Sequence, residues 1–112
     1  MHRRTIQKRS SQYCVGTWNV RSMNEGKLEV VKQEMARVNI NILGISELKW
    51  TGMGKCNSDD HYIYYCGQEF VRGNGVALLV NNRVQNAVLG CNFKNDRMIS
   101  AHFHLIYLEQ LI

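Results

Sequence analysis

Residues 13–46 read YCVGTWNVRSMNEGKLEVVKQEMARVNINILGIS, and their order of apolar and polar residues predicts a strand, a helix and a second strand. The run from Tyr13 to Asn19 is short and rich in aromatic, β-branched and small residues, which favours a buried strand. The run from Ile42 to Ser46 is apolar without alternation, as in a strand covered on both faces. Two strands joined by a helix form a βαβ unit, in which the strands are parallel and the crossover is nearly always right-handed.

The helix of this unit is predicted from a capping motif and an apolar stripe. Ser22-Met23-Asn24-Glu25 fits the S-x-x-E capping box, in which the Ser and Glu side chains satisfy free amides of the first turn. The stripe on one helix face consists of Leu28, Val31, Met35 and Val38. This spacing predicts an amphipathic helix that ends near Asn39.

Beyond the βαβ unit the sequence predicts a meander of short strands in a mixed α/β sheet. The segment from Lys49 to Asp60 is polar and contains two glycines, so we expect a loop there. The expected strands are Tyr62 to Cys66, Val76 to Val80, Val88 to Cys91 and Met98 to Phe103.

The composition is typical of one small globular domain, because 45% of the 112 residues are hydrophobic and 21% are charged. A formal net charge of +5 favours an anionic partner, of which nucleic acid is the commonest for a basic protein. Four basic residues precede the first apolar run: Arg3, Arg4, Lys8 and Arg9. They predict a solvated flexible tail, with a nuclear-import or phosphate-contacting arm as the alternative.

The cysteines and the hydropathy pattern bear on the compartment. Cys14, Cys56, Cys66 and Cys91 stand far apart without a C-x-x-C pair, so we expect reduced thiols, which suit the cytosol or nucleus. No apolar run approaches the ~20 residues that span a bilayer. We therefore expect a soluble nuclear or cytoplasmic protein that is neither secreted nor bound to a membrane.

Two polar residues end the predicted parallel strands, Asn19 the first and Glu47 the second. Parallel strands place their carboxyl ends at one edge of a sheet, where open α/β sheets bind ligands. A carboxylate at that edge is a ligand that Mg²⁺ accepts, together with waters and phosphate oxygens. On spacing alone, a carboxylate that caps a helix or stabilises a loop explains Glu47 as well.

Four motifs in chain order resemble the endonuclease domain of LINE-type retrotransposons. Thr17-Trp18-Asn19-Val20-Arg21-Ser22 is similar to its opening T-W-N-V-R-[ST] signature, and Ser46-Glu47-Leu48-Lys49-Trp50 is similar to its S-E-x-[KR]-W segment. Gly75 to Val80 resembles the G-V-A strand of that domain, and Asn95 to Ser100 resembles the segment that follows. From about Val15 to Ser100 the chain thus resembles the exonuclease–endonuclease–phosphatase superfamily, and especially the RTE clade of these retrotransposons.

This resemblance implies the N-terminal half of a two-sheet, DNase I-like α/β sandwich that cleaves DNA phosphodiester bonds with Mg²⁺ or Mn²⁺. Glu47 then binds the catalytic metal, and Asn19 orients the metal or the nucleophile through a hydrogen bond. Lys49, Arg21 and Trp50 are the implied substrate-binding residues, with Lys49 near the phosphate. Binding to DNA is expected to be weak and indifferent to sequence.

The later motifs of the family, a Tyr-Ala-Pro strand end, a G-D-[WF]-N turn and a terminal Ser-Asp-His, do not occur in this sequence. We therefore expect a basic flexible tail over 1–12, a partial endonuclease domain over 13–104 and a divergent tail over 105–112. Such a fragment is expected to be inactive alone and to self-associate through an exposed sheet, with Val76 to Val80 as an uncovered face or edge. A non-catalytic module that binds nucleic acid or protein is the alternative. A phosphatase-like relative is disfavoured by the T-W-N-V-R signature.

Two other groups of residues are weaker candidates for a metal site. Asp59-Asp60-His61 is a potential cluster, but a solvated loop is the favoured interpretation. His102 and His104 fall on one face of an extended chain, and two ligands without a third favour an ordinary surface.

Overall fold

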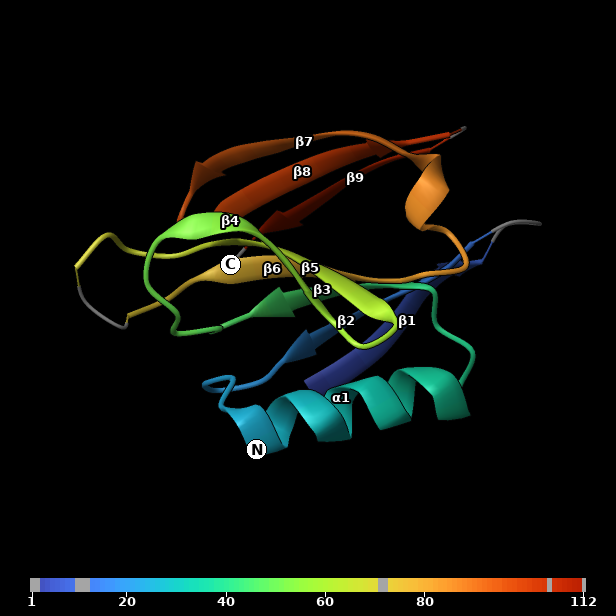
Figure 1. Cartoon of the computed structure of the whole chain (residues 1–112), viewed down its shortest axis with the longest axis horizontal. Coiled ribbons are helices and arrows are strands. Elements are labelled where there is room, and N and C mark those ends of the chain that lie inside the picture. The colour runs from blue at the N-terminus through green and yellow to red at the C-terminus, as the bar shows by residue number, and fades with distance from the viewer. Residues whose placement is uncertain (1–2, 10–12, 71–72, 105, 112) are drawn as a thin grey trace.

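The computed structural model describes the backbone of the whole chain except residues 1–2, 10–12, 71–72, 105 and 112. It is a mixed α/β fold made mostly of strands, with one helix on a large sheet and a second, smaller sheet on the other side (Figure 1). The elements are β1 (Arg3–Arg9), β2 (Cys14–Asn19), α1 (Glu25–Arg37), β3 (Ile42–Ser46), β4 (Met53–Ser58), β5 (His61–Cys66), β6 (Val76–Asn81), the 3-10 helix η1 (Gln85–Ala87), β7 (Val88–Asn95), β8 (Met98–Phe103) and β9 (Ile106–Leu111). The large sheet has the order β1-β2-β3-β6-β5-β4, and the small sheet has the order β7-β8-β9.

The predicted strand–helix–strand unit is present. β2 and β3 pair in parallel from Val15 opposite Ile42 to Asn19 opposite Ser46, with α1 between them in the chain. The other strands of the large sheet pair antiparallel, as the meander predicted. The two strands that end in Asn19 and Ser46 therefore end at the same edge.

The start of α1 differs from the prediction. Its N-cap is Asn24, whose side chain accepts a hydrogen bond of 2.9 Å from the Lys27 amide. The capping box that began at Ser22 is wrong, because the Ser22 amide donates to the Glu47 carbonyl and holds that segment outside the helix. The helix ends at Arg37 and Asn39 follows with φ of 59°, so the predicted end is confirmed.

The large sheet is covered on both faces. On one face, Val31 and Met35 of α1 are buried against a cluster that includes Leu43, Ile45 and Leu79. On the other, β8 buries Ile99, Ala101 and Phe103 against the strands of the large sheet. Each of these side chains except Ala101 contributes about 1.5–3 kcal/mol on full burial, so two separate clusters stabilise the sheet.

β6 is the central strand of this arrangement. Ala77 and Leu79 point into the helix-side cluster, whereas Val76, Leu78 and Val80 point into the cluster between the sheets. The expectation that Val76 to Val80 forms an uncovered face or an unpaired edge is wrong. The reason is that β7 and β8 fold back over this face, while β3 and β5 flank β6 within the sheet.

Three segments expected to be irregular are strands. β1 lies in the predicted tail over 1–12 and pairs antiparallel with β2, and β9 lies in the predicted tail over 105–112 and pairs with β8. β4 lies within the predicted loop and pairs with β5 along its length. All three occupy sheet edges, and β1 and β4 lack the apolar pattern that marks an inner strand. In the part of the chain that the structure describes, no helix is long and apolar enough to cross a membrane.

Candidate functional site

Asn19 and Glu47 lie at the same edge of the large sheet, as the sequence predicted. Asn19 is opposite Ser46 in the parallel ladder, and Glu47 is the next residue. Both side chains are half-buried. The Asn19 Oδ1 accepts a hydrogen bond of 3.2 Å from the Arg21 amide, which leaves the Asn19 amide nitrogen as the donor toward any ligand at this edge.

Three loop segments are joined at this edge by main-chain hydrogen bonds. The amides of Ser22 and Met23 donate to the carbonyls of Glu47 and Leu48, at 2.7 and 2.9 Å. The amides of Leu48 and Lys49 in turn donate to the carbonyls of Gly75 and Asn74, at 3.1 and 2.7 Å. The Leu48 side chain is fully buried. The loop that carries Glu47 is thus held from both sides and anchored in the core.

The same segments concentrate backbone strain. Seven non-glycine residues in the described part of the chain have positive φ, and five of them lie here: Arg21, Ser22, Glu47, Lys49 and Asn74. Such conformations cost on the order of 1–3 kcal/mol each and persist where surrounding structure enforces them, which is most often at functional sites. Strain of this density is therefore independent support for a functional role of this edge.

Gly75 shows how tightly the strained segments fit. Its φ is 102°, and a Cβ atom at this position would lie 3.2 Å from both the Leu48 Cβ and the Lys49 amide nitrogen. The predicted G-V-A strand thus begins with a residue whose lack of a side chain permits the close approach of the Glu47 loop.

The three predicted substrate-binding residues differ in accessibility. Arg21 is exposed and Lys49 is half-buried, so both side chains are at least partly accessible to solvent. Trp50 is already engaged, because its Nε1 donates to the Met23 carbonyl at 2.6 Å and its ring packs edge-on against Tyr65 at 5.1 Å. These contacts give Trp50 a role in fixing the loop, and its contact with substrate stays a prediction.

Asp96 is a residue of this edge that the sequence reasoning did not assign to the site. Its carbonyl accepts from the Gly75 amide at 2.9 Å, and its carboxylate accepts from the Asn74 side chain at 3.3 Å. The turn between β7 and β8 is thereby attached to the segment that holds Lys49. The Asn95-Asp96 pair was a signal for a turn, but its partner was not predictable from local sequence.

The edge offers a donor set that suits a hydrated hard cation. Glu47 supplies a carboxylate, and Mg²⁺ is usually held by one or two carboxylates with waters and phosphate oxygens completing its shell. Among the described residues there is no group of three or more His, Cys, Asp or Glu side chains arranged around a common point. A divalent metal at this edge would take Glu47 as a carboxylate ligand, with water and substrate oxygens completing its shell.

Asp59 and Asp60, two residues of the weaker candidate cluster, bind different partners. The Asp59 carboxylate accepts from the ammonium of Lys32 at 2.8 Å, whereas Asp60 pairs with the Nδ1 of His61 at 2.8 Å. Burial by itself lowers the pKa of Lys32, but hydrogen bonds to Asp59 and Glu29 outweigh it and raise that pKa above its usual value. The hydrogen bond from His61 lowers the pKa of Asp60. The two carboxylates thus stabilise the β4–β5 turn separately.

A cleft of about 190 Å³ lies at the opposite end of the large sheet, where β6 ends. Its lining includes His61, Asn39 and Arg83. Because β6 begins beside the Glu47 loop and runs the length of the sheet to this cleft, the cleft is separate from the candidate site.

The four cysteines are free thiols. Cys14 and Cys66 are buried in the two cores, Cys91 is half-buried and Cys56 is exposed on the edge strand β4. Burial raises the pKa of Cys91 to about 11, so this thiol stays protonated at neutral pH. Buried reduced cysteines such as Cys14 and Cys66 behave as small apolar residues.

The structure therefore defines a mixed α/β protein with a strained polar edge at the ends of two parallel strands. No protein-family model matches the chain. Over 92 residues, or 82% of its length, the chain is 78% identical to craniofacial development protein 2 of Tragulus javanicus. It is 77% identical to craniofacial development protein 2 of Bos taurus over the same length. The chain spans 16% of the length of each of these relatives.

Proposed function

We propose that this chain is a piece of a divalent-metal-dependent DNA endonuclease of the exonuclease–endonuclease–phosphatase superfamily, descended from a LINE-type retrotransposon of the RTE clade. The observation that carries the proposal is the placement of Asn19 and Glu47 at one sheet edge, within loops that are strained and joined by hydrogen bonds. These two residues stand in the two motifs that resemble the active-site strands of that superfamily. The proposal also accounts for the basic net charge, which favours DNA as the partner.

In the proposed reaction each residue of the edge has a separate task. The Glu47 carboxylate would hold Mg²⁺ or Mn²⁺, which polarises the phosphoryl oxygen and stabilises the leaving alkoxide. The Asn19 amide nitrogen is available to donate a hydrogen bond to a phosphate oxygen or to water, because its Oδ1 is engaged by Arg21. Lys49 and Arg21 would contact the phosphate backbone. A nuclear or cytoplasmic location is part of this proposal.

The piece alone is proposed to be inactive. The Glu47 carboxylate can hold a hydrated cation, but the terminal Ser-Asp-His motif that supplies the nucleophile-orienting pair in that superfamily does not occur in this sequence. The curated relatives are much longer than this chain, which spans 16% of their length. Catalysis would need groups from the remainder of such a protein.

Two measurements test the proposal. Mn²⁺ binding, followed by paramagnetic broadening of backbone amide signals, is expected to centre on residues 19–22 and 46–49 and to be lost in Glu47→Gln. The matched control is Glu69→Gln, which removes an exposed carboxylate at the same end of the molecule. Nicking of supercoiled plasmid with Mg²⁺ is expected to be negligible for both the unmodified chain and Glu47→Ala. Broadening that persists unchanged in Glu47→Gln would refute the metal site. Nicking that depends on Glu47 would refute the need for further residues.

A non-catalytic nucleic-acid or protein interaction module is the second candidate. It is favoured by the small number of acidic side chains at the edge, since the described residues form no group of three or more His, Cys, Asp or Glu side chains that could hold a metal. This function predicts DNA or protein binding that is the same with Mg²⁺ and with a chelator. The metal-binding experiment above separates the two candidates.

A further inference from the structure

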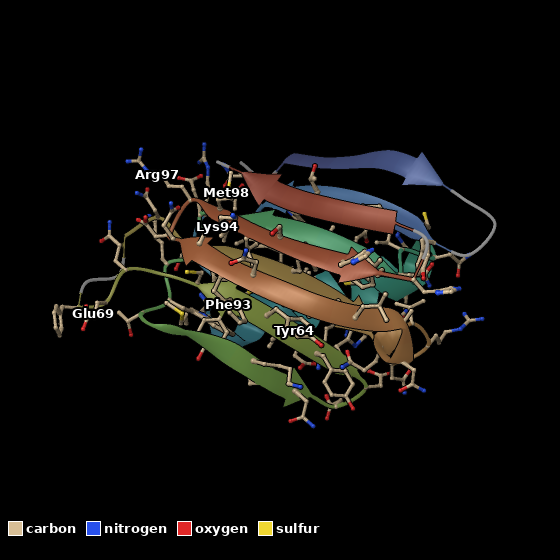
Figure 2. The ribbon with its side chains drawn as sticks, turned by 90° about the horizontal axis from the view of Figure 1, so that it is seen from above. Tyr64, Glu69, Phe93, Lys94, Arg97 and Met98 are labelled. Carbon is tan, nitrogen blue, oxygen red and sulfur yellow. The ribbon has the colours of Figure 1, made fainter. Side chains whose placement is uncertain are left out.

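The turn between β7 and β8 presents two cations at the end of the molecule that carries the candidate site. Lys94 and Arg97 flank the turn and are both exposed, and Figure 2 shows them at the same end as Glu69. The acidic residue between them, Asp96, is half-buried, and its carboxylate accepts a hydrogen bond from the Asn74 side-chain amide. The turn therefore shows positive charge to solvent.

The position of this turn is fixed relative to the Glu47 loop. The Gly75 amide donates to the Asp96 carbonyl, while the Gly75 carbonyl accepts from the Leu48 amide. The Arg97 amide also donates to the Asn95 side chain at 2.8 Å, which tightens the turn. A polyanion bound along Lys94 and Arg97 would thus be held at a defined place beside the candidate site.

An exposed aromatic residue lies on the loop that leads to the same point. Phe70 is 86% exposed, more than any other large hydrophobic side chain among the described residues, and its loop ends at Gly75. Trp50, which the resemblance implied as a substrate-binding residue, is held by Met23 and Tyr65. Among the described residues, Phe70 is thus an exposed aromatic ring at this end that can stack on a ligand.

We propose that Phe70, Lys94 and Arg97 form a binding surface for an unpaired DNA strand beside the candidate active site. Exposed aromatic rings and cations together are the pattern that binds single-stranded nucleic acid, because bases stack on the ring while the cations neutralise phosphates. A duplex keeps its base faces stacked and cannot use Phe70 in this way. The identity of the partner as DNA rests on the proposed function, whereas the surface itself does not depend on Glu47 or on a metal.

The test measures binding of the full chain to labelled oligothymidine and to a duplex of equal length, by fluorescence anisotropy in the presence of EDTA. The single strand is expected to bind more tightly than the duplex. Phe70→Ala is expected to weaken single-strand binding about tenfold without changing its salt dependence. Phe70→Trp, which keeps an aromatic ring, is expected to bind the single strand as tightly as the unmodified chain. Lys94→Gln and Arg97→Gln are each expected to lower the slope of log Kd against log salt by about 0.7.

Arg83→Gln is the matched control, because Arg83 is exposed and lies at the opposite end of β6. It removes the same charge and is expected to leave binding almost unchanged. Equal losses of affinity in Arg83→Gln and Arg97→Gln would overturn the proposed surface, because net charge alone would then explain the binding. An unchanged affinity in Phe70→Ala, or a duplex bound as tightly as the single strand, would overturn the stacking role. Because no metal is present, these outcomes are independent of the Mn²⁺ test on Glu47, so failure of either proposal is recognised separately.

Discussion

The Ser22 amide donates a hydrogen bond of 2.7 Å to the carbonyl of Glu47, and both residues have positive φ, 97° and 54°. This bond links the segment after β2 to the segment after β3 at the ends of the two parallel strands. It also explains why α1 begins at Glu25 and not beside Ser22, since the chain must first satisfy this contact. The strain at the candidate site and the delayed start of the helix therefore have one cause.

Relief of this strain is the first prediction. Ser22→Gly is expected to raise the free energy of unfolding by about 1 kcal/mol, because glycine adopts positive φ without the steric penalty of a Cβ atom. Urea denaturation followed by tryptophan fluorescence measures the change. Ser58→Gly, at the end of strand β4, is the control and is expected to lose stability. Destabilisation in Ser22→Gly would show that the Ser22 side chain makes an essential contact.

Two glycines provide a matched test of the Trp50 loop. A Cβ atom on Gly67 would lie 1.9 Å from the Trp50 carbonyl oxygen, whereas a Cβ atom on Gly90 meets nothing within 4 Å. Gly67→Ala is expected to lower the free energy of unfolding by about 1–3 kcal/mol, as overpacking does. Gly90→Ala should be neutral or slightly stabilising, because glycine weakens a strand. Equal stability of the two variants in thermal melts would contradict the packing of Gly67 on Trp50.

The strand–helix–strand unit was predictable because burial on both faces imposes an apolar pattern on the inner strands. β2 and β3 show that pattern and were located within a residue of their ends. β1 and β4 were missed because edge strands satisfy their backbone groups by pairing on one side only, which a polar sequence also permits. β9 was missed because its segment departs from the family motifs and was assigned to a divergent tail. Inner strands are thus recognised by their apolar sequence, whereas the pairing of edge strands depends on tertiary contacts that the local sequence does not show.

The candidate site shows the same division. Asn19 and Glu47 were placed correctly, since the topology of a βαβ unit fixes where strand ends lie. Asp96 was not identified, because its relation to the site passes through hydrogen bonds to Asn74 and Gly75, and Phe70 was not identified, because its exposure is not apparent from the sequence. Neither residue has a local pattern that distinguishes it from an ordinary turn or loop residue.

Selective thiol labelling tests the burial of the cysteines. Cys56 is exposed, whereas Cys14 and Cys66 are buried and the pKa of Cys91 is raised to about 11 by burial. Iodoacetamide at pH 8 is expected to label Cys56 first in the native chain, even though burial also raises the pKa of that thiol. Mass spectrometry of digested samples identifies the site. Cys56→Ser should abolish the fast phase, and rapid labelling of Cys91 would contradict the arrangement of the two sheets.

Lys32 gives a prediction for alkaline pH. Its side chain is 7% exposed, and its ammonium contacts the carboxylates of Asp59 and Glu29 and the Ser58 hydroxyl. Burial opposes the charge, but hydrogen bonds to the two carboxylates outweigh it, so the pKa of Lys32 in the folded state lies above its usual 10.5. A group whose pKa is raised on folding contributes its stability below the unfolded pKa and loses it as pH rises through the folded pKa.

The free energy of unfolding is therefore expected to fall above about pH 10.5, in part through Lys32. Lys32→Met keeps the length of the side chain but removes the titrating group, so its stability at pH 9 and at pH 11 should differ less than that of the unmodified chain. Urea titrations at the two pH values measure both differences. Lys27→Met, on the same helix, is the control and is expected to follow the unmodified chain. An alkaline loss of stability that is identical in Lys32→Met and in the unmodified chain would show that the ion pair between α1 and the β4–β5 turn contributes nothing to folding.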